Sequence, residues 1–236
     1  MNCLITGASV GIGKALAYKM GSLGYNLFLT YYSNQKLCEE LKQELVNKYG
    51  IECYTSKCDL HSEEEIKNII LKFKDKFGSM DILVNNASIS HDSLIEDKTK
   101  EEFMDVLEVN VLGTFLMSKY AVSIMNKNGV IINMSSTDGI DTYSLYNIDY
   151  SVSKAGIIQL TKVLSLVYND LRTIAVAPNW VETESTLEMN QDYLKSELER
   201  IGQNKLIEKE KVIQDIIHII VDKSIKSGSI IRIDGE

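Results

Sequence analysis

The sequence predicts an α/β fold built on a parallel β-sheet, and three observations lead to this prediction. Short apolar runs such as CLIT, NLFLTYY and ILVNN are separated by longer amphipathic stretches. The two patterns alternate roughly every 25 to 30 residues, which is the rhythm of βαβ units. A glycine follows each of the first helical stretches, at Gly24, Gly50 and Gly78. Glycine tolerates the left-handed conformation that ends a helix and turns the chain into the next strand.

Seven strands are expected, one at each apolar run. They start near residues 2, 26, 51, 81, 129, 172 and 228. The first helix is expected in GKALAYKMGSLG, and residues 62–77 carry apolar side chains at helical spacing. Further helices are expected over residues 100–126, 149–168 and 209–223.

The chain is expected to form a single domain over residues 1–236, because no low-complexity linker interrupts the pattern. Residues 179–208 are the exception to its regularity. This polar stretch is too long for a simple connection and has few apolar residues to anchor it. It is expected to be either disordered or a substrate lid, since lids are built from weakly anchored chain.

The composition argues against several classes of function. The 236 residues include 33 acidic and 25 basic side chains, a net charge of −8, and the lysines alternate with glutamates. This pattern predicts neither a nucleic-acid nor a membrane partner. The four cysteines form no C-x-x-C pair and the three histidines are scattered, so no metal site is expected. With no signal-peptide pattern in MNCLITGAS and no long apolar run, a cytoplasmic protein with reduced thiols is expected.

The turn TGASVGIG after the first strand predicts a nucleotide site. Its glycines Gly7, Gly11 and Gly13 have the spacing G-x-x-x-G-x-G. Glycines let the backbone approach a pyrophosphate, and the helix that starts there offers free N–H groups and the positive end of its dipole. A tight turn without a ligand is the alternative, but the order of strand, turn and helix favours a nucleotide.

The end of the second strand, LFLTYYSNQ, bears on which cofactor is used. An enzyme that selects NAD usually has an acidic residue there, which accepts a hydrogen bond from the ribose 2′-hydroxyl. Here the matching region contains Tyr31 and Tyr32 and no carboxylate, while Ser33, Asn34 and Lys36 can donate to a 2′-phosphate. NADP(H) is therefore favoured over NAD(H), although no arginine is present to clamp the phosphate.

The segment YSVSK places Tyr150 four residues before Lys154, so the two share one helix face. An ammonium group beside a phenol is expected to lower its pKa and fit it for proton transfer. The alternative is an ordinary start of an amphipathic helix. Tyr32 and Lys36 have the same spacing, but YSN resembles a turn that leads into a helix, so that pair is not expected to share a helix face.

Taken together, the motifs resemble those of the short-chain dehydrogenase/reductase family. They are TGASVGIG, CDL at 58–60, NNAS at 85–88, VNVLG at 109–113, MSS at 134–136 and YSVSK. The resemblance implies a doubly wound, seven-stranded parallel sheet of the Rossmann-like type in a three-layer sandwich. It also implies an oxidoreductase that transfers a hydride between NADP(H) and a carbonyl or alcohol substrate. Within the family, 3-oxoacyl-[acyl-carrier-protein] reductases are the nearest in appearance.

The resemblance also implies site residues. The catalytic set would be Asn110, Ser136, Tyr150 and Lys154. Ser136 rather than Ser135 would bond the substrate oxygen, and Asn110 would hold a water in a proton relay with Lys154. Asp59 would bond the adenine and Asn86 would lie near the adenosine ribose. The full set of implied cofactor contacts is Gly7, Ser9, Gly11, Ile12, Gly13, Tyr31, Ser33, Asp59, Leu60, Asn86, Ala87, Tyr150 and Lys154.

Three positions depart from the family pattern: Ser88 and Asn179 replace usual glycines, and Ile174 stands where asparagine is common. A non-catalytic, nucleotide-binding regulatory protein therefore remains the alternative. The resemblance further implies a homo-oligomer, a tetramer or dimer packed through the two long helices and the C-terminal strand. The substrate would be a small-molecule or acyl-carrier-bound carbonyl compound.

Overall fold

Seven strands form one parallel sheet in the computed structural model, which describes residues 1–235. They are β1 (Asn2–Ile5), β2 (Asn26–Tyr31), β3 (Cys53–Lys57), β4 (Met80–Asn85), β5 (Met125–Met134), β6 (Arg172–Pro178) and β7 (Ile230–Ile233). Their spatial order is β3-β2-β1-β4-β5-β6-β7, and every pairing is parallel. The chain winds outward from β1 to β3, returns to β4 and then winds the other way, so the predicted doubly wound sheet is confirmed. Ligands bind such sheets at the carboxyl ends of the strands where the winding reverses, which here is between β1 and β4.

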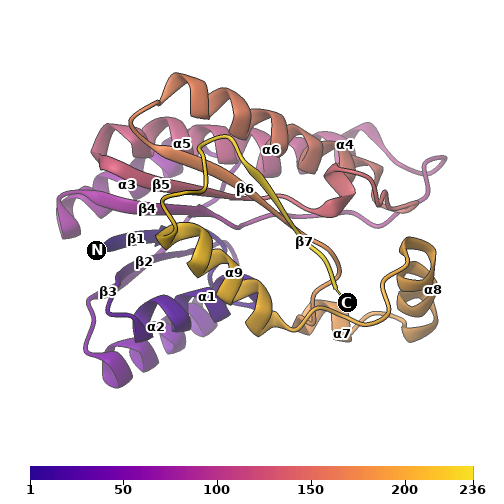
Figure 1. The fold of residues 1–236 in the computed structure, drawn as a ribbon, viewed down its shortest axis with the longest axis horizontal. Helices are drawn as coiled ribbons and strands as arrows, with labels where there is room; N and C mark the ends of the chain where they lie inside the picture. Colours follow the sequence, from indigo (N-terminus) through magenta and orange to yellow (C-terminus); the bar gives the residue numbers. More distant parts are fainter. Residues whose placement is uncertain (236) are drawn as a thin grey trace.

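Helices cover both faces of the sheet (Figure 1). One side holds α1 (Gly11–Ser22), α2 (Gln35–Tyr49) and α9 (Lys209–Val221), and the other holds α3 (Glu63–Phe77), α5 (Thr114–Ala121) and α6 (Ile148–Val167). Alternate strand residues face opposite layers. Cys3 and Ile5 of β1 therefore join the core under α1 and α9, while Leu4 joins the core under α3 and α5. The three-layer prediction is confirmed.

The helix expected over residues 100–126 is not continuous, and this prediction was wrong in two respects. α4 (Lys100–Leu107) runs into a π-helical segment (Glu108–Gly113) before α5, and a 3₁₀ turn (Val122–Ile124) follows α5. Strand β5 then starts at Met125 rather than near residue 129. The early start reflects an irregular pairing with β4, where the register shifts between Met80 and Ile82. The π-helical segment contains Asn110, and such segments often mark functional sites.

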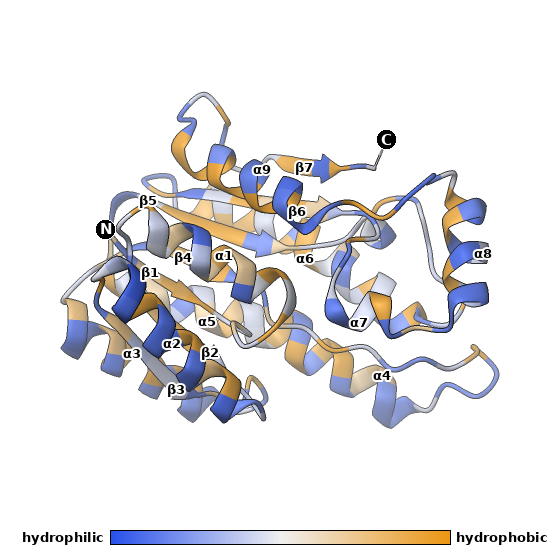
Figure 2. Cartoon of the chain, turned by 90° about the horizontal axis from the view of Figure 1, so that it is seen from below, coloured by the Kyte–Doolittle hydropathy of each residue, from blue (hydrophilic) through white to orange (hydrophobic). Residues whose placement is uncertain are grey.

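The stretch 179–208 is ordered, so the expectation of disorder was wrong. It contains α7 (Glu184–Leu187) and α8 (Gln191–Ile201), and Val181 pairs with Ile207 in an isolated bridge. Leu194 and Glu197 of α8 are buried. Figure 2 shows α7 and α8 at one end of the molecule and α8 largely hydrophilic in colour. The anchors are few and widely spaced, which is why the sequence pattern did not reveal them.

The other predicted helices form within two residues of their expected bounds. In α3, the Ser62 side chain caps the first turn by accepting a hydrogen bond from the Glu65 backbone N–H, and the helix ends at Gly78. Its apolar face is buried, as the spacing predicts: Ile66, Ile69, Ile70 and Phe73. Among the residues that the structure describes, no helix is long and apolar enough to span a membrane.

Candidate active site

Two adjoining cavities lie at the carboxyl ends of the strands. The larger, of about 730 Å³, extends from the glycine turn along the ends of β2, β3 and β4. The smaller, of about 300 Å³, lies around Ser136, Tyr150 and Asn179. Ile12, Asn86 and Tyr150 line both, so the two spaces are continuous. We call them the cofactor groove and the substrate cavity.

The glycine turn has the geometry of an anion-binding loop. Gly7 and Gly11 have φ angles of +64° and +58°. A Cβ atom on Gly7 would lie 2.9 Å from the Cα of Ala87, and one on Gly13 would lie 2.5 Å from the Gly7 carbonyl oxygen. Helix α1 begins at Gly11, and its N-cap residue Val10 provides no side-chain cap, so the first turn is suited to a ligand anion. Within residues 1–235, the buried hydroxyl of Ser9 has no hydrogen-bond partner. These features fit a bound pyrophosphate.

Hydrogen bonds from Asn86 hold this turn against the end of β4. The side-chain amide of Asn86 donates to the backbone carbonyls of Thr6 and Gly7, at 3.0 Å each. The backbone N–H groups of Asn86 and Ala87 both donate to the Thr6 hydroxyl. Asn86 and Ala87 therefore fix the floor of the cofactor groove as well as line it.

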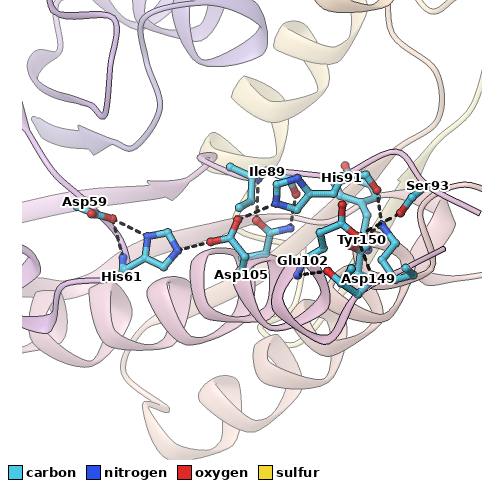
Figure 3. Close-up of polar contacts among 12 residues, drawn as sticks. Asp59, His61, Ile89, His91, Ser93, Glu102, Asp105, Asp149 and Tyr150 are labelled. Carbon is cyan, nitrogen blue, oxygen red and sulfur yellow. Dashed lines mark hydrogen bonds and ion pairs between the residues drawn. The ribbon is translucent and has the colours of Figure 1, made fainter. Parts of the chain in front are cut away.

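A chain of charged side chains lies at the far end of the groove, where Tyr31, Ser33, Asp59 and Leu60 line it. Figure 3 shows His61 between two carboxylates, with Nδ1 2.7 Å from Asp59 and Nε2 2.7 Å from Asp105. The second oxygen of Asp105 lies 2.7 Å from Nε2 of His91. A neutral imidazole has a single N–H, so the two short contacts of His61 require the protonated ring.

The pKa shifts agree with this arrangement. Burial acts to lower the pKa of His61, but hydrogen bonds to Asp59 and Asp105 outweigh it and raise the pKa. The hydrogen bond from His91, followed by that from His61, lowers the pKa of Asp105. No sequence pattern indicates this cluster, because His61 and His91 are far apart in the chain. In the described part of the chain, no group of His, Cys, Asp and Glu is placed to hold a metal ion.

Lys57 is a residue that sequence reasoning missed at this end of the groove. Its ammonium lies 5.6 Å from the ring centroid of Tyr32, which lines the groove. The parallel register of β2 and β3 places Lys57 beside Tyr31. The position of Lys57 at the end of the third predicted strand was therefore the sequence signal that could have identified it. Lys36, by contrast, pairs with Glu40 on α2 at 3.8 Å and is 88% exposed. Tyr32 precedes α2, so the second Y-x-x-x-K match shares no helix face, as predicted.

Ser136, Tyr150 and Lys154 come together at the substrate cavity. The Lys154 ammonium lies 5.1 Å from the Tyr150 ring centroid and donates to the Met134 carbonyl at 2.8 Å. Ser136 and Tyr150 line the same cavity, and the Ser136 Oγ accepts a hydrogen bond from the Asp138 backbone N–H at 3.1 Å. The hydroxyl of Ser135 instead donates to the Lys154 carbonyl at 2.8 Å. Ser136 is therefore the serine with a hydroxyl available to a substrate.

Asn110 lies behind this group. Its side-chain oxygen accepts from the Ile89 backbone N–H, and its amide donates to the Ile89 carbonyl and to the Ser153 hydroxyl. It reaches Lys154 only through the neighbouring Ser153. Of the three departures from the family pattern, Ser88 and Asn179 line the substrate cavity, whereas Ile174 is fully buried in β6.

The pKa of Tyr150 differs from the sequence-based expectation. Burial raises this pKa, the charge of Asp138 raises it further, and the nearby Ser136 hydroxyl lowers it only in part. Burial also lowers the pKa of Lys154 to about 8. Because the pKa of Lys154 falls below that of Tyr150, the amine is largely neutral at the pH where the phenol ionises, so Lys154 does not produce the expected lowering of the Tyr150 pKa.

Comparisons with known proteins agree with this geometry. The model of the family described as short chain dehydrogenase matches residues 1–194. The 3-oxoacyl-[acyl-carrier-protein] reductase FabG of Aquifex aeolicus is 32% identical over 237 residues, covering 98% of this chain and 95% of its own. FabG of Thermotoga maritima is 33% identical over 238 residues, covering 99% and 96%.

Solved structures show the same fold. A dehydrogenase/reductase from Sinorhizobium meliloti superposes with a TM-score of 0.92 at 25% identity, covering 99% of this chain and 93% of that one. A short chain dehydrogenase from Burkholderia cenocepacia in complex with NADP gives 0.91 at 23% identity, covering 99% and 96%. The glycine turn, the doubly wound sheet and the family match agree, and the chain belongs to the short-chain dehydrogenase family of NAD(P)-dependent oxidoreductases.

Proposed function

We propose that this protein reduces the carbonyl group of its substrate with NADPH, using Ser136, Tyr150 and Lys154 as catalytic residues. The observation that supports this most is that the three side chains meet in a cavity continuous with the cofactor groove. When bound, the nicotinamide supplies the hydride. The alternative, a regulatory protein that binds the nucleotide without catalysis, leaves this convergence unexplained.

The proposed roles follow from the hydrogen bonds. Because Ser136 Oγ accepts from the Asp138 N–H, its own proton is available to the substrate carbonyl oxygen. The raised pKa keeps Tyr150 protonated at neutral pH, so the phenol can donate a proton to the developing alkoxide. We assign Asn110 a positioning role, because it ties Ile89 to Ser153, the residue before Lys154.

In the cofactor groove, the glycine turn with Ser9 and Ile12 would hold the pyrophosphate, and Asp59 and Leu60 would contact the adenine. Asn86 and Ala87 would lie at the ribose.

We propose that Lys57, with Tyr31 and Ser33, favours the 2′-phosphate of NADP(H), since no carboxylate directly follows β2. Replacing Lys57 with Ala should weaken NADPH binding by about 10-fold and leave NADH binding little changed. Fluorescence titration measures both, and K48A, at an exposed site in the last turn of α2, is the control. Equal losses for the two cofactors would contradict this role.

The names of the curated relatives make 3-oxoacyl groups on acyl carrier protein the first substrates to assay. We propose further that residues 1–236 form one catalytic domain, that residues 179–208 act as its lid, and that the protein works as a homo-oligomer in the cytoplasm. The lid proposal is supported by Thr183, Thr186 and Met189, which line the substrate cavity.

Replacing Tyr150 with Phe tests the central proposal. Turnover of the best carbonyl substrate should fall by about 10²- to 10⁴-fold, because the proton donor is removed. NADPH binding, measured by fluorescence titration, should remain. A fully active Y150F enzyme would show that the assignment is wrong. A wild-type protein that binds NADPH but reduces no ketone or 3-oxoacyl thioester would favour the regulatory alternative.

A further inference from the structure

Most of the residues that line the substrate cavity carry polar side chains, although apolar side chains such as Met134, Trp180 and Met189 also line it. Besides that of Tyr150, the polar side chains include those of Ser88, Ser90, Ser136, Ser144, Asn147 and Asn179. Two acidic residues, Asp92 and Asp138, also line it, and Lys154 is its one basic residue among the described residues. Asp92 is exposed to solvent, whereas Asp138 is partly buried beside the proposed catalytic residues.

Asp138 is held close to Ser136 and Tyr150. It lies in the 3₁₀ turn Thr137–Gly139, and its backbone N–H donates to Ser136 Oγ. The buried Thr142 hydroxyl donates to its Oδ1 at 2.6 Å. Asp138, Tyr150 and Lys154 line the same cavity. The negative charge of Asp138 adds to the raised pKa of Tyr150 and partly opposes the lowering of the Lys154 pKa by burial.

One oxygen of this carboxylate remains available. No hydrogen bond from the described part of the chain reaches Oδ2, while Oδ1 is bound by Thr142. The positive charges of Arg200 and Lys154 act on Asp138 and partly balance it, with Glu197 opposing them. Because Oδ1 is bound by Thr142 and the basic residue Lys154 lines the same cavity, a neutral hydroxyl is a suitable donor to the free Oδ2. Its burial raises its own pKa, as expected for a carboxylate removed from water.

We propose that Asp138 is a specificity-determining residue that accepts a hydrogen bond from a hydroxyl on the carbon next to the reacting carbonyl. This rests on the proposed carbonyl reduction and narrows its substrates to neutral hydroxy ketones. A keto acid would place a carboxylate against Asp138, and like charges repel strongly in a partly buried cavity. A plain ketone or a 3-oxoacyl thioester has no such hydroxyl and would leave Asp138 desolvated without a donor.

Three substrates of similar shape test this in the wild-type enzyme with NADPH: 1-hydroxybutan-2-one, pentan-3-one and 2-oxobutanoate. The first should be preferred over each of the others in kcat/KM by about 10- to 100-fold, the range for hydrogen bonds to charged groups. Acetoacetyl-CoA serves as the 3-oxoacyl thioester. Equal kcat/KM values for the hydroxy ketone and pentan-3-one would overturn the inference, and so would a preference for acetoacetyl-CoA.

The variants D138N and D138S should lower the ratio of kcat/KM for 1-hydroxybutan-2-one to that for pentan-3-one by about 10-fold. In the wild type, this ratio should also fall as Asp138 is protonated at acidic pH, and D138N should remove that dependence.

D141N is the matched control. Asp141 lies three residues later, outside the lining of the cavity, so D141N should keep the ratio. An unchanged ratio in folded D138N or D138S would overturn the inference alone. Failure of NADPH-bound wild type to reduce any of the four compounds would overturn the carbonyl reduction itself and this inference with it.

Discussion

Burial of the charged Lys154 side chain destabilises the folded state. The side chain is 3% exposed, and burial lowers its pKa from 10.5 to about 8. A buried ammonium loses hydration that one backbone carbonyl, that of Met134, restores only in part. The native state therefore holds this proton more weakly than the unfolded chain does, and its stability must depend on pH.

The sign of this dependence is fixed by the lowered pKa. Between pH 8 and pH 10.5 the unfolded state binds more protons at Lys154 than the folded state, so stability rises with pH across that window. We expect the free energy of unfolding of the wild type, relative to that of K154M, to increase from pH 7 to pH 10. Urea denaturation of both proteins measures it. K36M, at a site that is 88% exposed, is the control and should show no such difference. A constant difference across the range would contradict the buried charge.

At the scale of elements, His61 connects the loop after β3 to α4. It bridges Asp59 of that loop and Asp105 of α4, and both contacts need the protonated ring. Asp105 is also shared with His91, which ties in the segment after β4. Three segments distant in the sequence are thus joined at the end of the groove that Asp59 lines.

The pKa of His61 is raised in the folded protein, so its contribution to stability is complete below the unfolded pKa and is lost as pH rises through the folded value. The stability difference between wild type and H61Q should therefore be larger at pH 5.5 than at pH 8.5. It should stay below about 1 kcal/mol, because the side chain is 35% exposed and solvent screens such pairs. Thermal denaturation measures it, and H218Q, at a site 68% exposed, is the control. A larger difference at pH 8.5 would contradict the bridge.

Arg200 links α8 to the loop that follows Ser135 and Ser136. Its guanidinium donates to the carbonyls of Thr142 and Tyr143 and pairs with Glu197 at 2.7 Å. Glu197 is only 4% exposed, so removing its partner would leave a buried charge unpaired. Tyr193 of α8 also packs edge-on against Tyr146. These contacts hold α8 against the loop that contains Thr142, Tyr143 and Tyr146.

We therefore expect R200M to loosen residues 179–208. Limited proteolysis within this segment should become several-fold faster, and the KM for the substrate should rise more than kcat falls, because the cavity loses part of its wall. K195M is the matched control, since Lys195 lies on the same helix with 77% of its side chain exposed. Equal cleavage rates in R200M and wild type would show that Arg200 does not anchor the lid.

At the scale of the molecule, the outer face of α5 and α6 presents apolar side chains to solvent: Phe115, Val152, Val163 and Leu166. Apolar surface of this kind, on adjacent helices, is typical of an interface. We expect the wild type to be an oligomer in solution and the double variant F115E/V163E to have a lower mass by light scattering. L23E, at the end of α1 beneath the opposite face of the sheet, should leave the mass unchanged. A monomeric wild type would contradict the proposed assembly.

Much of this architecture could be predicted because it depends on local pattern. The apolar runs specify strands by their burial, and Gly24, Gly50 and Gly78 mark turns that need positive φ angles. The Tyr150–Lys154 spacing fixes two side chains on one helix face whatever surrounds them. The predictions that were wrong concern features that depend on contacts between residues distant in the sequence. The break in the helix around Asn110 depends on hydrogen bonds to Ile89, which is 21 residues earlier in the chain.

The order of strands and helices, the glycine turn and the residues able to carry the chemistry follow from the sequence alone, because they depend on neighbours within a few positions. The fold was needed to reveal three further features: the burial that raises the pKa of Tyr150, the meeting of His61 and His91 at Asp105, and the presence of Asp138 in the substrate cavity. Burial and charge act through space, and residues far apart in the chain set them.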